Sequence, residues 1–117
     1  WVYGLLKEAD IKLTAQGSDI KEIDEALKTA SKAGTGNVGF PEYCGVVKDF
    51  LIVIEDKASL DQHINEISGV VAQDVKSVKD NAVNGALFYA LHLAKHTSYK
   101  KVLAFGISGD EKHHRIR

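Results

Sequence analysis

A short apolar run that ends abruptly in charged residues constrains the fold more than any other feature of the sequence. Phe50 to Ile54 are five consecutive apolar residues that favour a strand, and Glu55-Asp56-Lys57 follow them directly. Such a run is typical of a strand buried on both faces of a sheet. Because successive side chains of a strand alternate between faces, we expect Glu55 and Lys57 to point one way and Asp56 the other. The run therefore predicts a central strand that carries an acid and a base into a partly dry site.

The flanking segments predict an α/β domain with a mixed central β-sheet flanked by helices. Strands are predicted on either side of the apolar run, at residues 43–47 and 102–107. Lys48-Asp49 forms a plausible hairpin turn between the first two strands. Helices are predicted at residues 2–9, 18–32 and 72–95. The strand, crossover helix and strand that end the chain form a unit expected to be parallel and right-handed.

Size and composition are those of one ordinary globular domain. The chain has 117 residues, of which 44% are hydrophobic and 26% are charged. No apolar run is long enough to cross a bilayer, and residues 1–6 lack the basic flank and cleavage site of a signal peptide. Cys44 is the only cysteine, which excludes an internal disulfide and fits a reducing cytoplasm. We expect Cys44 to be a small buried residue on a strand.

The charge balance excludes a protein that binds nucleic acid over its whole surface. Fifteen basic and sixteen acidic residues give a net charge of −1, so any contact with DNA must use a local patch or other domains. Candidate phosphate contacts, each of which fits a solvated face equally well, are Lys28, Lys32, Lys95, Lys100 and Lys101. The chain starts without Met and ends in a charged string, so we expect residues 1–117 to be one domain cut from a longer protein.

Glu42 adds a second carboxylate to the end of the predicted sheet. Twelve residues separate Glu42 from Glu55, so a hairpin between residues 43–47 and 50–54 would bring the two together. Two carboxylates at one sheet end suit Mg²⁺, which accepts oxygen ligands and keeps several waters for substrate phosphates. Lys57 would then orient a water molecule or offset negative charge in the transition state. This arrangement predicts metal-assisted hydrolysis of a phosphodiester.

These residues also match a family pattern. Pro41-Glu42, twelve residues and then Glu55-Asp56-Lys57 resemble the PD-(D/E)XK nuclease signature. A wider set of segments resembles the N-terminal region of restriction-associated N6-adenine DNA methylases, in which a nuclease domain precedes a methyltransferase domain. These segments are residues 30–36, 39–43, 50–57, 82–90 and 107–109.

The resemblance implies a restriction-endonuclease-like core and a DNA endonuclease that depends on Mg²⁺ or Mn²⁺. By position, Glu42 and Glu55 would be metal ligands, the backbone carbonyl of Asp56 would complete the metal shell, and Lys57 would be the catalytic lysine. The resemblance also places Gln16 and Asn84 near the site. It implies double-stranded DNA as substrate, methyltransferase and recognition domains in the parent chain, and a possible dimer on DNA for cutting both strands.

The sequence departs from the family pattern and leaves other functions open. Glu42 stands where Asp is usual, which shifts the geometry of that ligand, and no methylase motif such as Asn-Pro-Pro-Tyr is present. One alternative is a catalytically degenerate module that binds DNA or partner domains. Another is a solvated strand end at residues 55–57 with no catalytic role. A third is a zinc protein built on His92 and His96, which lie one helical turn apart.

Overall fold

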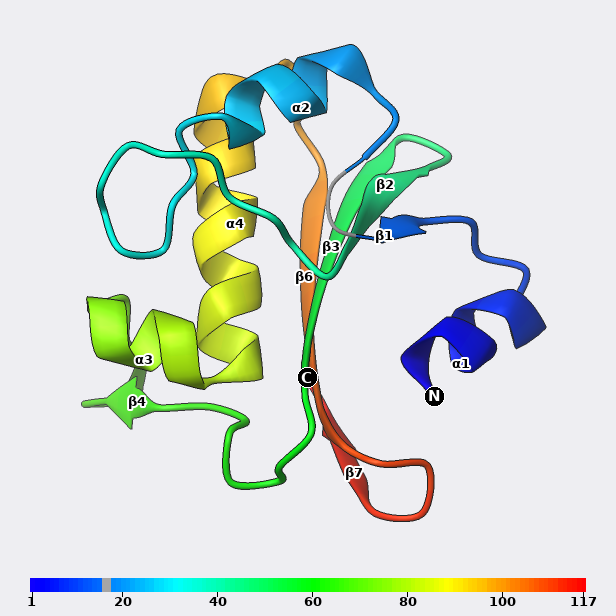
Figure 1. Cartoon of the computed structure of the whole chain (residues 1–117), viewed down its shortest axis with the longest axis vertical. Helices are drawn as coiled ribbons and strands as arrows, with labels where there is room; N and C mark the ends of the chain where they lie inside the picture. The colour runs from blue at the N-terminus through cyan, green and yellow to red at the C-terminus, as the bar shows by residue number, and fades with distance from the viewer. Residues whose placement is uncertain (16–17) are drawn as a thin grey trace.

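The computed structural model describes residues 1–15 and 18–117, so Gln16 lies outside the described residues. Figure 1 shows the arrangement of helices around an edge-on sheet. In chain order the elements are α1 (Val2–Glu8), β1 (Thr14–Ala15), α2 (Lys21–Leu27), β2 (Tyr43–Val47), β3 (Phe50–Lys57), β4 (Glu66–Ile67), β5 (Val70–Val71), α3 (Val75–Asp80), α4 (Ala82–His96), β6 (Val102–Gly109) and β7 (His114–Ile116).

The main sheet is mixed, as the sequence predicts. Over the described ranges it holds five strands in the order β1-β2-β3-β6-β7. β2 and β3 form an antiparallel hairpin whose turn begins at Lys48, which adopts a positive φ of 57°. β3 and β6 pair in parallel, and the chain between them contains α3 and α4. The predicted hairpin and the predicted parallel strand–helix–strand unit are both confirmed.

β3 is longer than the apolar run that predicted it. It continues through the charged triplet to Lys57, because β6 supplies a partner for each added residue. Glu55 pairs with Gly106, Asp56 with Ile107 and Lys57 with Ser108. The charged residues therefore lie inside the sheet, three positions beyond the apolar run, and they alternate between faces as predicted.

The helix expected at residues 72–95 is divided in two at Asn81, whose φ of −122° and ψ of 138° are extended. α3 begins at a capped position, where the backbone N–H of Ser77 donates to the Asp74 carboxylate at 3.1 Å. α4 starts afresh because the loop after β3 satisfies its first amides. The N–H of Ala82 donates to the carbonyl of Gln62 at 3.0 Å, and that of Val83 to the carbonyl of His63 at 2.8 Å.

Helices cover both faces of the sheet, and the side chains of β3 separate the two cores. α2 and α4 lie on one face and α1 on the other (Figure 1). Leu51 and Val53 join the core shared with α2 and α4, whereas Ile52 and Ile54 pack toward α1. This alternation places Glu55 on the α4 face, where it is the next side chain after Val53 on that face. Cys44 is fully buried in the first core, as expected, and burial raises the pKa of its thiol to about 12.

Several elements differ from the sequence prediction in length or were missed. α2 spans only Lys21–Leu27, shorter than the predicted 18–32. The short strands β1, β4 and β5 carried no recognisable pattern, while β7 forms in a segment expected to be a solvated tail or an interdomain strand. Among the described residues, no helix has the length and apolar character needed to cross a membrane.

Gly106 is expected to be essential for packing α4 against β6. A Cβ atom added there would lie 2.6 Å from Val83 Cα and 2.7 Å from the Ala82 carbonyl carbon. Gly106→Ala should therefore destabilise the fold by about 1–3 kcal/mol, since the backbones must separate. Gly4→Ala is the control, because no atom lies within 4 Å of the added Cβ and a helical alanine should stabilise by about 0.5–1 kcal/mol. Urea unfolding measures both, and equal stabilities would contradict the predicted packing.

Candidate active site

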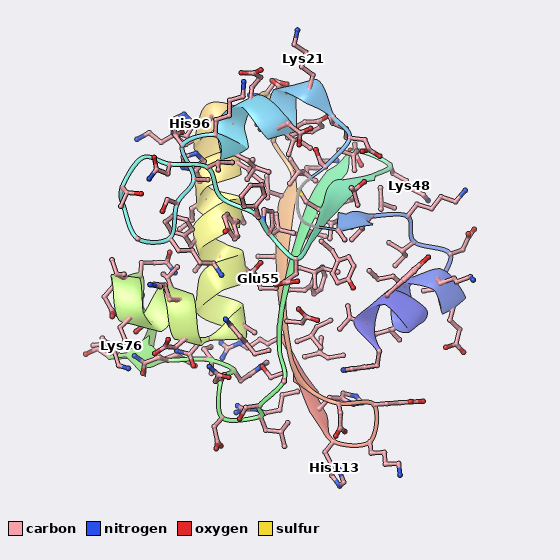
Figure 2. All side chains as sticks on the ribbon, in the orientation of Figure 1. Lys21, Lys48, Glu55, Lys76, His96 and His113 are labelled. Atoms are coloured by element: carbon pink, nitrogen blue, oxygen red, sulfur yellow. The ribbon has the colours of Figure 1, made fainter. Side chains whose placement is uncertain are left out.

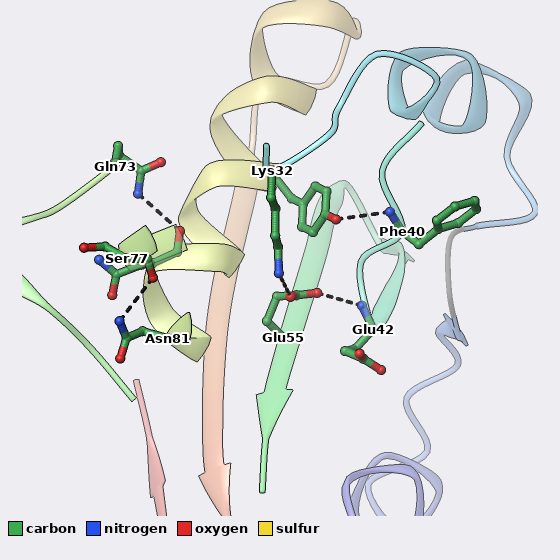
Figure 3. A network of polar contacts seen from close by, with 9 residues as sticks. Lys32, Phe40, Glu42, Glu55, Gln73, Ser77 and Asn81 are labelled. Atoms are coloured by element: carbon green, nitrogen blue, oxygen red, sulfur yellow. Dashed lines mark hydrogen bonds and ion pairs between the residues drawn. The ribbon is translucent and has the colours of Figure 1, made fainter. Parts of the chain in front are cut away.

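The carboxylate of Glu55 is the buried centre of the candidate site. The residue is only 3% exposed, although it carries a charge. Figure 2 shows it in the middle of the molecule, whereas Lys21, Lys48 and Lys76 extend from the periphery. Burying a carboxylate is costly unless ion pairs and hydrogen bonds compensate it. Glu55 has both, because Oε2 forms an ion pair with Lys32 Nζ and Oε1 accepts a hydrogen bond from the backbone N–H of Glu42 at 2.8 Å (Figure 3).

The register of the hairpin brings Glu42 to Glu55. Tyr43 pairs with Ile54, so Glu42 lies opposite Glu55 just before β2 begins. The predicted approach of these two residues is therefore confirmed, but the contact is made by the Glu42 backbone amide. In Figure 3 the Glu42 side chain extends away from Glu55. Glu42 and Glu55 thus lie opposite each other across the hairpin, while their carboxylate oxygens point in different directions.

The charged groups of the site influence the pKa of Glu42. Burial raises the pKa of Glu42, and the negative charges of Asp56 and Glu55 raise it further. The positive charges of Lys32 and Lys57 oppose that rise. Three carboxylates and two ammonium groups therefore share one electrostatic environment at this part of the sheet. A cation placed among the carboxylates would relieve their mutual repulsion.

Lys57 and Asp56 follow the alternation that the sequence predicts. Lys57 is partly buried on β3, two positions after Glu55, and thus on the same face. Asp56 belongs by the same alternation to the opposite face, where its charge also helps to raise the pKa of Tyr43 after the larger effect of burial. The side chain of Asp56 is therefore not aligned with Glu55, which leaves its backbone carbonyl as the group suited to the predicted metal shell.

The donor chemistry of the site fits Mg²⁺ or Mn²⁺. Within residues 1–15 and 18–117, no cluster of three or more His, Cys, Asp and Glu side chains is placed to hold a metal. The expected site does not need such a cluster, because it uses two carboxylates, a backbone carbonyl and water. Mg²⁺ binds through one or two carboxylates and retains several waters. Glu42 and Glu55 would supply that pair if the Glu42 side chain turned toward Glu55.

Two residues of α4 support the ion pair. Lys32 Nζ lies 5.2 Å from the centroid of the Tyr89 ring, close enough for a cation–π interaction. The Tyr89 hydroxyl accepts a hydrogen bond from the backbone N–H of Phe40 at 3.1 Å. Burial, with a further contribution from the charge of Glu55, raises the pKa of Tyr89 to about 12. Gly85 leaves room beside the pair, since an added Cβ would lie 3.0 Å from Lys32 Nζ and 3.3 Å from Glu55 Oε2.

The sequence did not reveal that Lys32 contacts Glu55. It placed Lys32 among candidate phosphate contacts, whereas the structure buries most of its side chain, which is 16% exposed, against Glu55. The two residues are 23 positions apart and belong to no common element. No local spacing could have paired them. Two of the other candidate lysines differ from Lys32. Lys28 and Lys101 form exposed ion pairs with Glu25 and Asp49.

Asn84 is fully buried, and its amide is occupied by the backbone of the loop that contains β4 and β5. Its Oδ1 accepts from the N–H of Asn65 at 2.8 Å, and its Nδ2 donates to the carbonyls of Asn65 at 2.9 Å and Ala72 at 2.7 Å. The structure thus gives Asn84 a role in fixing that loop to α4. Gln16, the other polar residue implied near the site, is outside the described residues.

In the histidine pair of the zinc alternative, His92 contacts other residues. The His92 and His96 rings lie 4.3 Å apart between centroids. Nε2 of His92 lies 2.9 Å from the Ala26 carbonyl and 3.3 Å from Thr29 Oγ1, so this nitrogen faces α2. In the part of the chain that the structure describes, no third side chain completes a metal cluster there.

Comparison with known proteins indicates a relationship by sequence. The chain is 36% identical over 114 residues to "Type II restriction enzyme and methyltransferase RM.BcgI" of Heyndrickxia coagulans. The chain is related to a restriction–modification enzyme. The similarity covers 95% of this chain but only 18% of that protein, so this chain corresponds to a small part of its relative. No protein-family model and no solved structure matches the chain significantly.

Asn84→Ala is expected to destabilise the fold by about 1–3 kcal/mol, because the Asn65 N–H loses its acceptor and the carbonyls of Asn65 and Ala72 each lose one of their donors. Urea unfolding measures the loss of stability, and hydrogen exchange of the Asn65 amide should become faster, because its acceptor is removed. Asn37→Ala, at an exposed loop position, is the control and should leave stability unchanged. Unchanged stability in Asn84→Ala would argue against this structural role.

Glu42→Gln is expected to stabilise the protein at pH 7. Since the folded pKa of Glu42 lies above the ordinary value of 4.5, its ionisation costs stability at pH values above the folded pKa. The cost disappears as the pH falls below 4.5, where Glu42 is protonated in both folded and unfolded chains. Unfolding measured from pH 4 to 7 should therefore show that the stability of Glu42→Gln, relative to the unaltered protein, increases with pH. A loss of stability at pH 7 would contradict the predicted repulsion.

Proposed function

We propose that this chain is a DNA endonuclease domain of a restriction–modification enzyme and that it depends on Mg²⁺ or Mn²⁺. The observation that carries the proposal is the buried carboxylate of Glu55, with Glu42 adjacent and Lys57 on the same face of β3. A restriction-endonuclease-like PD-(D/E)XK core accounts for this arrangement on a mixed sheet. The similarity to a protein named as a restriction enzyme and methyltransferase supports it.

In this proposal Glu42, Glu55 and the backbone carbonyl of Asp56 hold the metal. When bound, the divalent cation would polarise the scissile phosphate and lower the pKa of a coordinated water. Buried placement suits Glu55 for this role, because its orientation is fixed by two contacts from the segment between α2 and β2. Glu42 would complete the oxygen donors by turning its side chain inward.

Lys57 would supply the positive charge that the reaction requires. Its ammonium group would orient the attacking water or offset the negative charge that develops on the phosphate. Hydrolysis adds the hydroxyl of water to phosphorus and transfers a proton to the leaving deoxyribose oxygen. The products are one strand end with a phosphate and one with a hydroxyl, and no further reactant is needed.

Partners follow from the same proposal. The substrate would be double-stranded DNA, and recognition and methylation would belong to other domains of a longer polypeptide. With a net charge of −1, the domain has little general attraction for DNA, so those other domains would hold it on the duplex. Cutting of both strands would require two such sites, which dimerisation on DNA would provide.

Glu55→Gln and Lys57→Ala are each expected to lower Mg²⁺-dependent cleavage of supercoiled plasmid at least about 100-fold. Lys76→Ala is the matched lysine control, because Lys76 is 86% exposed and pairs with Asp80 of the same helix. Circular dichroism and thermal unfolding must show that each variant is folded. Cleavage retained by both Glu55→Gln and Lys57→Ala would reject the assigned roles.

The second candidate is a catalytically degenerate module that binds DNA or scaffolds a methyltransferase. The ion pair between Lys32 and Glu55 favours it, because a cation already compensates the carboxylate. Calorimetry of the unaltered protein with Mn²⁺ separates the two candidates. Binding that depends on Glu55 supports the endonuclease, whereas the absence of such binding supports the degenerate module.

A further inference from the structure

The ion pair between Lys32 and Glu55 occupies a position that the proposed metal would require. The side chains are 16% and 4% exposed, and Lys32 Nζ contacts Oε2 of Glu55 directly. The other oxygen, Oε1, already accepts the backbone N–H of Glu42. A divalent cation that binds Glu55 would therefore lie close to an ammonium group in a poorly hydrated site, where like charges repel strongly.

We infer that Lys32 is a displaceable counter-ion for Glu55, which neutralises the buried carboxylate in the metal-free protein and withdraws when a divalent cation binds. The inference rests on the proposed function, because it takes Glu55 as a metal ligand. Lys32 is in this view a positioning residue. It holds the carboxylate of Glu55 in place before the metal arrives, at a cost in metal affinity.

The surroundings of Lys32 suit a charge that forms a pair and then leaves it. Residues 28–42, which carry Lys32, form no helix or strand, so the backbone there is not fixed by a ladder of hydrogen bonds. Gly85 lets the ammonium group approach the α4 backbone closely, since a methyl group added there would lie 3.0 Å from Nζ. The Tyr89 ring, at 5.2 Å, is a second favourable contact that does not depend on Glu55.

One segment connects the release of Lys32 to the second metal ligand. Lys32 and Glu42 lie on the same irregular segment, and both contact the Glu55 carboxylate, one through Nζ and the other through a backbone amide. With Lys32 in place, the Glu42 side chain extends away from Glu55 (Figure 3). Withdrawal of the ammonium group removes the local positive charge that balances Glu55, and an incoming divalent cation would then attract both carboxylates.

The first test compares metal binding by Lys32→Met with that by the unaltered protein. Removing the competing ammonium should tighten Mn²⁺ binding, measured by calorimetry, on the order of tenfold. It should also lower the thermal stability of the metal-free protein and enlarge the increase in melting temperature that Mg²⁺ produces. Lys28→Met is the matched control, because Lys28 lies close by in sequence but pairs with Glu25 on the surface. Equal or weaker Mn²⁺ binding by folded Lys32→Met would overturn the inference.

A second test uses the unaltered protein and does not depend on the folding of any variant at Lys32. An amine-reactive reagent with peptide mass spectrometry should label Lys32 slowly in the metal-free protein and several-fold faster with saturating Mg²⁺. Lys28, already exposed, should react at the same rate in both conditions. Lys32 labelling that metal does not change would show that the ion pair persists, and the inference would fail.

Glu55→Gln separates failure of the inference from failure of the proposed function. Loss of Mn²⁺ binding in Glu55→Gln shows that Glu55 is a ligand, whatever Lys32 does. Mn²⁺ binding that survives Glu55→Gln, or binding by neither the unaltered protein nor Lys32→Met, overturns the proposed metal site and the inference with it. Unchanged labelling of Lys32 beside Glu55-dependent Mn²⁺ binding overturns the inference alone.

Discussion

The charge of one buried carboxylate must be balanced inside this domain, and that requirement determines how the segment between α2 and β2 packs against the sheet. Glu55 lies on the central strand with almost no access to water, so its charge must be balanced inside the protein. The balance comes from Lys32 and the Glu42 amide, which belong to the segment between α2 and β2. That segment is in turn joined to α4 through the hydrogen bond from Phe40 to Tyr89. An irregular stretch of chain is thus fixed against the sheet and α4 by polar contacts.

The sequence predicted the sheet better than the helices, for reasons that particular residues explain. The run Phe50–Ile54 required burial on both faces, and that requirement determined the mixed sheet and its place at the centre. The charged triplet after it was interpreted as a strand end, because charges are costly inside a sheet. Only the pairing with β6, which is distant in sequence, keeps Glu55 to Lys57 in the strand. The division between α3 and α4 was equally hidden, since the amides of Ala82 and Val83 find their acceptors in a loop.

The candidate site was predictable in its members but not in its contacts. Strand periodicity and the hairpin were sufficient to bring Glu42 next to Glu55 and to place Lys57 on the same face. They could not show that the Glu42 backbone, and not its carboxylate, faces Glu55. They also gave no sign that Lys32 is the counter-ion, because an ion pair across 23 residues depends on how the intervening segment folds. The roles in metal binding and cleavage remain proposals drawn from this arrangement and from the relative's name.

The proposed nuclease pattern has Asp at the position of Glu42, and the longer side chain of Glu is consistent with the contacts seen here. The Glu42 amide lies against the Glu55 carboxylate, so a short side chain would hold a second negative charge close to the first. An additional methylene lets the carboxylate turn away from Glu55. Burial, and after it the charges of Asp56 and Glu55, raise the pKa of Glu42. In the proposed metal site, the same length would allow the carboxylate to turn back when a cation offsets both charges. A longer acid at this position would thus lessen repulsion without placing the proposed ligand out of reach.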